Sequence, residues 1–267
     1  MIPLFDSLSH PTLTGRWGFG GAGGADATFP TLDRELRAAG FCAACAVGIA
    51  GVEGYAHEPF LRACAPYPAL VPVAGLDPLG PQPLATELDR IAGLGFRAVK
   101  VHPRFSRFEP TAQLLGEIFT AARDRGLVTF YCTFLHTSVD LYPAEDPLHI
   151  LVGGLKRSPG AKVVLLHGGD VQALRYAELV HYNPGLLLDL SYTLLKYRGS
   201  SLDADMSYLF RQLDRRICVG VDHPEFTHRE LRSRFDELAT GLAEEKARNI
   251  GYRNLAGFLG VEVPAGP

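Results

Sequence analysis

The sequence predicts an α/β fold of the (β/α)8-barrel class, and three observations lead to this prediction. Short runs rich in Val, Leu, Ile and Phe alternate with longer amphipathic stretches along the chain. Eight such strand-then-helix units can be counted, which favours a closed barrel over an open doubly wound sheet. No linker or low-complexity segment separates the units, so we expect residues 1–267 to form one domain.

The elements follow one another in a regular order set by apolar periodicity. The predicted strands, which share a dense apolar content, cover residues 2–6, 41–49, 70–75, 96–102, 127–132, 162–167, 185–191 and 216–222. The predicted helices, which share one apolar face, cover residues 31–39, 57–65, 82–93, 111–125, 146–157, 170–181, 203–213 and 227–239. A further helix near residues 243–257 closes the chain.

Two connections are longer than the usual loop from a strand to a helix. Residues 7–30 are rich in glycine, and residues 133–146 contain His136, which reaches the barrel mouth only if its loop folds inward. Both connections follow strands, so we expect both at the face where barrel enzymes place their sites. Each is either a simple insertion or a wall or lid of a substrate pocket.

The composition narrows the classes of partner. The formal net charge of −3 does not favour nucleic acid or an anionic membrane as a default partner. No apolar run approaches the ~20 residues of a membrane span, and the N-terminus has no basic segment typical of a secretion signal. Five cysteines, an odd number, are typical of a reducing compartment. We therefore predict a cytoplasmic protein that acts on a small molecule, as a monomer or a homo-oligomer.

Titratable side chains end several of the apolar strands. Alternate side chains of a strand share a face, so Lys100 and His102 are expected to point into the barrel while the valines between them face the helices. His167 ends the sixth strand, and Asp222 ends the eighth on its inward face. Buried groups of this kind need partners, because an unpaired one costs several kcal/mol.

The first strand offers a similar pattern if its extended backbone continues beyond Asp6. Asp6, Leu8 and His10 would then share one face. We therefore predict that titratable groups from distant parts of the chain surround one pocket, namely Asp6, His10, His102, His167 and Asp222.

Four short motifs stand near the ends of these strands. They are Phe5-Asp-Ser-Leu-Ser-His10, Val99-Lys-Val-His-Pro103, Leu165-Leu-His-Gly-Gly169 and Gly220-Val-Asp-His-Pro224. In this order and spacing the chain resembles the amidohydrolase-related family of barrel hydrolases and decarboxylases, from about residue 2 to residue 257. The resemblance implies a TIM barrel of the metal-dependent hydrolase type, with a divalent metal, usually zinc, in the barrel mouth.

The family pattern also implies roles for individual residues. Its first strand ends in Asp-x-His-x-His, so His10 is a candidate metal ligand. Its strand-eight aspartate binds metal and handles the proton of the attacking water, which assigns Asp222 as ligand and general base. Its strand-six histidine, here His167, binds metal or polarises the substrate. Metal-bound water ionises near pH ~7, which supplies hydroxide at neutral pH.

Two positions depart from the family pattern. Leu8 stands at the first histidine of strand one, and Cys132 stands where strand five commonly carries a histidine. A thiolate is a good zinc ligand, so one reading is a mixed metal site of His10, Cys132, His167 and Asp222. The alternative is that Cys132 is a small buried apolar residue and the barrel works without metal or binds it weakly.

The fourth strand and its loop supply candidate substrate-binding residues: Lys100, His102 and Arg104. Lys100 is expected to pair with a buried aspartate, Asp6 or Asp189. Arg104 either binds a substrate carboxylate or phosphate, since guanidinium gives bidentate contacts, or is a solvated loop charge.

These residues lead to two classes of function. The first is an enzyme that hydrolyses a C–N, C–O or lactone bond of a small carboxylated molecule, with Asp222 as base, and decarboxylation is its nearest alternative. The second is a catalytically inactive or metal-free barrel that binds a small molecule or serves as an accessory protein.

Overall fold

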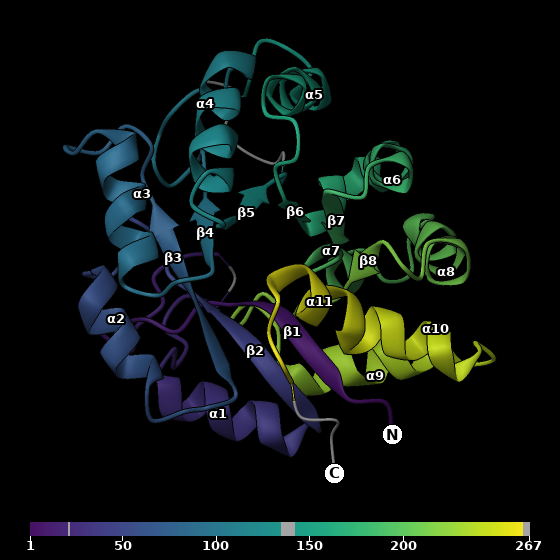
Figure 1. The fold of residues 1–267 in the computed structure, drawn as a ribbon. Coiled ribbons are helices and arrows are strands. Elements are labelled where there is room, and N and C mark those ends of the chain that lie inside the picture. The colour runs from purple at the N-terminus through teal and green to yellow at the C-terminus, as the bar shows by residue number, and fades with distance from the viewer. Residues whose placement is uncertain (21, 135–141, 264–267) are drawn as a thin grey trace.

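Eight parallel strands, each paired with the next one along the chain, form the centre of the molecule (Figure 1). The computed structural model describes residues 1–20, 22–134 and 142–263. The Ser7 amide donates to the Val219 carbonyl at 3.1 Å and the Asp222 amide to the Leu8 carbonyl at 2.8 Å. These bonds join the first strand to the eighth and nearly close the ring. The predicted (β/α)8 barrel is confirmed.

The strands lie close to their predicted positions: β1 (Leu4–Ser9), β2 (Phe41–Val47), β3 (Leu70–Leu76), β4 (Ala98–Val101), β5 (Val128–Cys132), β6 (Val163–Leu166), β7 (Leu186–Asp189) and β8 (Ile217–Cys218). The helices surround them: α1 (Phe29–Ala38), α2 (His57–Cys64), α3 (Leu84–Gly93), α4 (Ala112–Arg123), α5 (Pro147–Arg157), α6 (Ala173–Tyr182), α7 (Thr193–Lys196), α8 (Leu202–Gln212), α9 (His228–Ala239), α10 (Glu244–Arg248) and α11 (Asn254–Leu259). The short helix α7 was not predicted.

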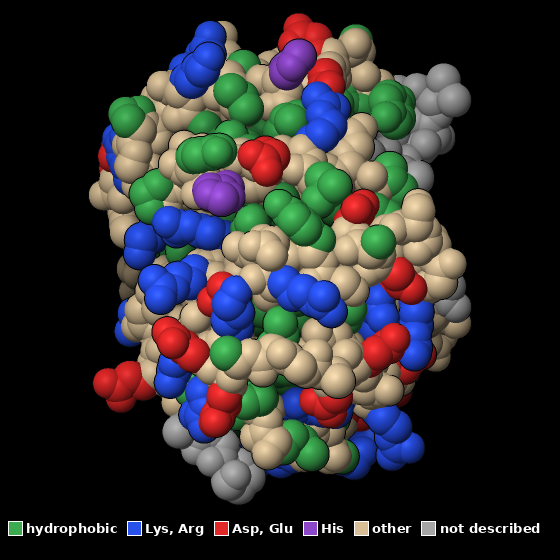
Figure 2. Space-filling view, turned by 90° about the vertical axis from the view of Figure 1, so that its right-hand side faces the viewer, with side chains coloured by type: hydrophobic (Ala, Val, Ile, Leu, Met, Phe, Trp, Pro, Cys, Tyr) green, Lys and Arg blue, Asp and Glu red, His purple; other side chains and the backbone are tan. Residues whose placement is uncertain are grey.

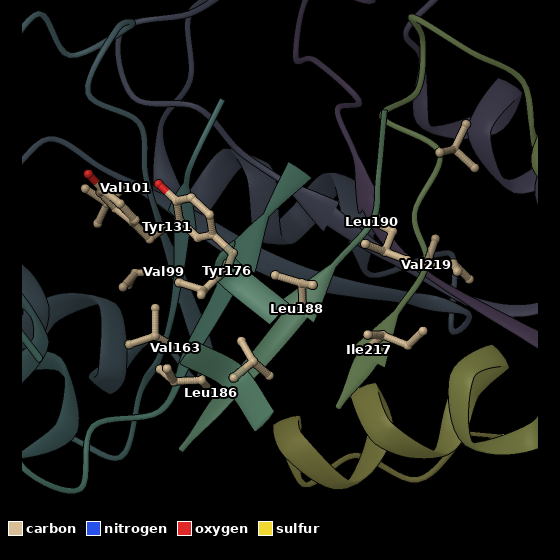
Figure 3. Packing of buried hydrophobic residues seen from close by; sticks show 14 of the residues in the cluster. Val99, Val101, Tyr131, Val163, Tyr176, Leu186, Leu188, Leu190, Ile217 and Val219 are labelled. Atoms are coloured by element: carbon tan, nitrogen blue, oxygen red, sulfur yellow. The ribbon is translucent and has the colours of Figure 1, made fainter. Parts of the chain in front are cut away.

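The alternation of side chains along the strands separates two apolar cores. Outward residues such as Val99, Leu188 and Val219 pack against the helices, and Tyr176 of α6 lies among them (Figure 3). Inward residues such as Phe130 fill the barrel interior. Each fully buried side chain of this size contributes about 1.5–3 kcal/mol.

Capping residues fix where several helices begin. The side chains of Thr28, Thr111 and Asp146 accept hydrogen bonds from the first-turn amides of α1, α4 and α5. Thr227 and Glu230 form a reciprocal capping box at the start of α9. Each such cap contributes about 1 kcal/mol.

A tight turn of 3-10 type, His167–Gln172, separates β6 from α6. Gly169 has φ of 77°, and a Cβ atom there would lie 2.1 Å from the ring of Tyr176. Only glycine fits both requirements. The helix predicted from residue 170 therefore begins at Ala173.

The C-terminal segment closes the end of the barrel opposite the carboxyl ends of the strands. Leu255, Ala256 and Leu259 of α11 pack with residues of the barrel interior, and α11 contacts β1, β7 and β8. The helix predicted near residues 243–257 is confirmed as one unbroken helical run, in which a π turn at Asn249–Arg253 joins α10 to α11. Gly251 brings this turn against the Pro3 carbonyl, where a Cβ atom would lie only 2.9 Å away.

The surface carries charges of both signs. On the face shown in Figure 2, Lys and Arg side chains lie interspersed with Asp and Glu. Among the residues that the structure describes, none of the helices has the length and apolar character that a bilayer crossing requires.

Candidate active site

A cavity of about 170 Å3, here called the mouth cavity, lies at the carboxyl ends of the strands. Six of the eight residues predicted for the site line it: His10, Lys100, His102, Arg104, His167 and Asp222. The seventh, Cys132, lines an adjacent side cavity of about 350 Å3. Arg104 and Phe134 line both cavities and so stand between them.

A lysine occupies the centre of the mouth. Lys100 of β4 reaches across the barrel, and its Nζ lies 3.0 Å from Nε2 of His10. Nδ1 of His10 lies 2.7 Å from the Val47 carbonyl, which can only accept, so Nδ1 carries the proton and Nε2 accepts from the ammonium. Oδ1 of Asp222 lies 3.4 Å from the same Nε2. We call His10, Lys100 and Asp222 the mouth cluster.

Burial and mutual charge set the protonation of the mouth cluster. Burial, followed by the charge of Lys100, lowers the pKa of His10, so its ring is neutral. Burial also lowers the pKa of Lys100. For Asp222 burial acts against ionisation, but the positive charges of His167 and Lys100 outweigh it, and the pKa of the carboxyl is held well below its usual value. Asp222 is therefore a carboxylate at neutral pH.

Cys132 lies between two histidines. Burial alone would raise the pKa of its thiol, but His102 and His167 outweigh burial and hold that pKa well below its usual value. The pKa of His167 is raised despite burial, because Cys132 and Asp222 favour the imidazolium. Burial lowers the pKa of His102 to about 4. The arrangement is that of a thiolate paired with a protonated His167 and a neutral His102.

Aromatic residues from the loops that follow the strands line the mouth cavity. The ring of Trp17 stacks on His10, with centroids 5.5 Å apart, and its Nε1 donates to Glu225 at 2.9 Å. Phe105 packs on His102 at 4.4 Å. The guanidinium of Arg104 lies 4.5 Å from the centre of the Phe134 ring. The loop at residues 7–30 is therefore a pocket wall rather than a simple insertion.

Trp17, Glu225 and Tyr192 also line the mouth, although the sequence prediction did not include them. The signal for Trp17 was present, since it is the single tryptophan of the chain and lies in a long glycine-rich loop. Thr133, Phe134 and residues 142–144 line the side cavity. His136 falls outside the described residues.

The prediction for Asp6 is wrong. A register shift in β1 sets Asp6 opposite Ala44 and Ser9 opposite Ala46, so three steps along β1 match two along β2. This bulge breaks the expected alternation. Oδ1 of Asp6 accepts from the amides of Leu8 and Val221 at 3.0 and 2.8 Å, and Oδ2 lies 3.2 Å from Nε2 of His228 in α9. The side chain therefore faces away from the mouth.

The expected pairing of Lys100 with Asp6 or Asp189 is also wrong, since Lys100 bonds to His10. Asp189 instead accepts from the hydroxyls of Ser7 and Ser191, and from the His167 amide at 3.2 Å. Burial raises the pKa of Asp189. This network positions His167 by holding its backbone against β7 and β1.

The residues of the mouth do not fit a zinc ion as they stand. No three of the predicted ligands His10, Cys132, His167 and Asp222 have donor atoms within 4.8 Å of one another. The free lone pair of His10 already accepts from the Lys100 ammonium. An ammonium thus sits beside the donors that a metal would need, and it supplies positive charge to Asp222.

Comparisons with known proteins agree with this architecture. A family model described as amidohydrolase matches residues 12–206. An uncharacterized TIM-barrel protein, Bb4693, from Bordetella bronchiseptica has a TM-score of 0.76 at 17% identity, covering 97% of this chain and 98% of that one. No curated protein matches the sequence.

Two other solved structures cover both chains almost completely. One is a probable 2-pyrone-4,6-dicarboxylic acid hydrolase from Acinetobacter baumannii with citric acid bound, at TM-score 0.68 and 14% identity, covering 96% of this chain and 99% of that one. The other is 5-carboxyvanillate decarboxylase from Sphingomonas paucimobilis, at TM-score 0.68 and 13% identity, covering 98% and 100%. At such identities the likeness shows a shared fold.

Proposed function

This chain belongs to the amidohydrolase family, and from that premise we propose that it is a hydrolase of small carboxylated molecules with Asp222 as its general base. The bond cleaved is a C–O bond of an ester or lactone, or a C–N bond. The observation that carries the proposal is a carboxylate at the edge of a cavity that also holds His167 and Lys100, whose charges keep it ionised.

Asp222 would accept a proton from a water molecule as the water oxygen bonds to the carbonyl carbon of the substrate. A base with a lowered pKa is weak, so it needs a reactive carbonyl. This favours a lactone or activated ester over an unactivated amide. Asp222 has a side chain that is 14% exposed, so solvent reaches it.

The cations around Asp222 suit the charge that develops in the reaction. As water adds, negative charge moves to the carbonyl oxygen, and a fixed ammonium at Lys100 would stabilise it. When the C–O bond breaks, the leaving oxygen takes a proton from the His167 imidazolium. The proton held by Asp222 then returns His167 to its charged form through solvent, so the proton count balances over one turnover.

Arg104 would bind a carboxylate of the substrate. Its guanidinium lines both cavities and is held on the Phe134 ring. A planar guanidinium binds a carboxylate in bidentate fashion. Lys100 and His102 would contact the part of the substrate nearest the reacting carbonyl.

Decarboxylation is the second candidate, and the protonated His167 favours it. A carbanion left by loss of CO2 must be protonated, and an imidazolium beside the mouth cavity is a suitable donor. A barrel that binds a carboxylated molecule without reaction is the remaining alternative.

A substrate panel separates these functions. The full chain is incubated with lactones, activated esters, amides and aromatic carboxylic acids, with and without chelator, and both hydrolysis and CO2 release are measured. We expect lactone or ester hydrolysis that persists in chelator and falls about 10²–10⁴-fold in Asp222→Asn. Release of CO2 without hydrolysis would establish the decarboxylase, and ligand binding without turnover would establish the binder. Asp89→Asn, a surface change on α3, serves as the matched control.

A further inference from the structure

Helices α1 and α9 lie together on the outside of the barrel (Figure 1), and a second group of titratable side chains lies between them. It consists of Glu35, His223 and His228, which we call the outer cluster. Nδ1 of His223 lies 3.5 Å from Oε2 of Glu35, and Nδ1 of His228 lies 3.8 Å from the same oxygen. The ligand atoms of all three residues lie within 4.8 Å of one another.

The outer cluster is buried but not satisfied. His223 and His228 are 3% and 0% exposed. Neither ring nitrogen of His223 has a hydrogen-bond partner among the described residues, and the same holds for Nδ1 of His228 and Oε2 of Glu35. Buried polar atoms without partners are rare in folded proteins and call for an explanation, of which a bound ion is one.

The spacing fits ligands of a common ion better than hydrogen bonds. Distances of 3.5 and 3.8 Å are long for hydrogen bonds of an imidazole to a carboxylate. Two donors that are each 2.0–2.1 Å from a tetrahedral zinc ion lie roughly 3.3 Å apart. A modest inward shift of Glu35, whose side chain is 33% exposed, would bring its Oε2 to that spacing from each imidazole nitrogen.

The second ring nitrogen of His228, Nε2, makes a contact that is typical of metal-bound histidines. Its Nε2 lies 3.2 Å from Oδ2 of Asp6, which is fully buried. Zinc-binding imidazoles usually donate their second N–H to a carboxylate in this way, which directs the other nitrogen to the ion.

An ion can reach the outer cluster from solvent. Glu35 and His228 line a surface cavity of about 630 Å3. Arg37 and Arg232, which also line it, are engaged elsewhere: Arg37 pairs with Asp33, and Arg232 donates to backbone carbonyls that include Ala39.

We propose that Glu35, His223 and His228 form a binding site for one divalent transition-metal ion of the zinc class. Two imidazoles and one carboxylate provide the nitrogen and oxygen ligands that zinc accepts, and solvent supplies the fourth. The ion links α1 to α9 and to the segment after β8, directly beside Asp222 but on the opposite side of the backbone.

The test measures metal binding and is independent of any activity. The full chain is freed of metal, titrated with Zn²⁺ by calorimetry, and loaded with Co²⁺ for visible absorption spectroscopy. We expect one ion per chain and the absorption of four-coordinate cobalt. In Glu35→Gln, which changes a partly exposed residue, Zn²⁺ affinity falls at least about 100-fold, beyond the range for loss of an outer-shell partner. His223→Gln gives the same result.

Two control variants locate the ion. His57→Gln removes another buried histidine that pairs with a carboxylate, Glu87 at 2.7 Å, and we expect it to leave the Zn²⁺ affinity unchanged. Cys132→Ser removes the candidate ligand of the barrel mouth, and we expect the same. The proposal is overturned if the wild-type chain binds no Zn²⁺, if Glu35→Gln binds it normally, or if Cys132→Ser abolishes binding.

Discussion

Asp222 and His223 are neighbours in the chain, yet their side chains belong to two clusters of opposite character. Asp222 joins the mouth cluster, where a buried ammonium, Lys100, supplies the positive charge. His223 joins the outer cluster, where both of its ring nitrogens, Nδ1 of His228 and Oε2 of Glu35 have no hydrogen-bond partner among the described residues. Both clusters lie where β1 meets the segment after β8. The difference teaches that the mouth cluster is held together by a lysine of the chain itself, whereas the outer cluster keeps buried polar atoms that an added ion would satisfy.

Replacing Lys100, the buried cation of the mouth cluster, should have the largest effect on the catalytic rate. In Lys100→Met the ammonium beside Asp222 and His10 is lost, and the developing oxyanion loses its fixed donor. We expect kcat/KM to fall roughly 10²–10³-fold on the substrate found in the panel. Lys162→Met, which changes a lysine outside the mouth, should leave the rate unchanged. Equal activity in both variants would show that Lys100 has no catalytic role.

A destabilising substitution near the mouth should leave metal binding by the outer cluster unchanged. Gly169→Ala places a methyl group against Tyr176 at a backbone angle that favours glycine. We expect thermal or urea unfolding to show a loss of about 2–4 kcal/mol, while Zn²⁺ affinity stays within experimental error. Gly93→Ala, at an exposed end of α3 with no atom within 4 Å, should be neutral. Similar stability of the two variants would contradict the close packing at Gly169.

Arg104 tests whether the mouth recognises an anion. In Arg104→Gln we expect KM to rise about 10-fold with a smaller change in kcat, because a charged hydrogen bond to the substrate is lost. Steady-state kinetics with a carboxylated substrate and its methyl ester would show the effect only for the acid. Arg211→Gln on α8 is the control, and a KM change common to both substrates would rule out carboxylate binding.

The smallest effect expected is a shift in a pH profile. The pKa of His167 is raised chiefly by Cys132, after the opposing effect of burial. The imidazolium therefore persists above the usual histidine range and is lost as pH rises through the raised pKa. In Cys132→Ser that support disappears, so the alkaline limb of kcat/KM should move to lower pH. An unmoved limb would mean that His167 is not the proton donor.

Many residues of the mouth cavity could be predicted from the sequence. Side chains of a strand point alternately to its two faces, and this alternation can be read from the local sequence. Lys100 and His102 face inward, as their positions in β4 indicated, and six predicted residues line one cavity. Asp6 was misplaced because the bulge in β1 is not encoded in an apolar pattern. The hydrogen bond from Lys100 to His10 joins residues that are 90 positions apart in the chain. Whether it forms depends on the width of the barrel.

The outer cluster could not be found from sequence for a related reason. Glu35 lies on α1, His223 lies in the loop after β8, and His228 is the first residue of α9. Their meeting depends on how α1 packs against α9. The C-terminal helix was predicted, but the π turn inside it was not, because the close approach of Gly251 to Pro3 leaves no mark in an apolar pattern.

The position of α11 also limits the route by which a ligand can reach the mouth cavity. Its apolar residues plug one end of the barrel, and tightly packed side chains fill the interior above them. A ligand of the mouth cavity therefore cannot enter or leave through this end of the barrel. It must pass in both directions at the carboxyl ends of the strands, where Trp17 and its neighbours line the rim.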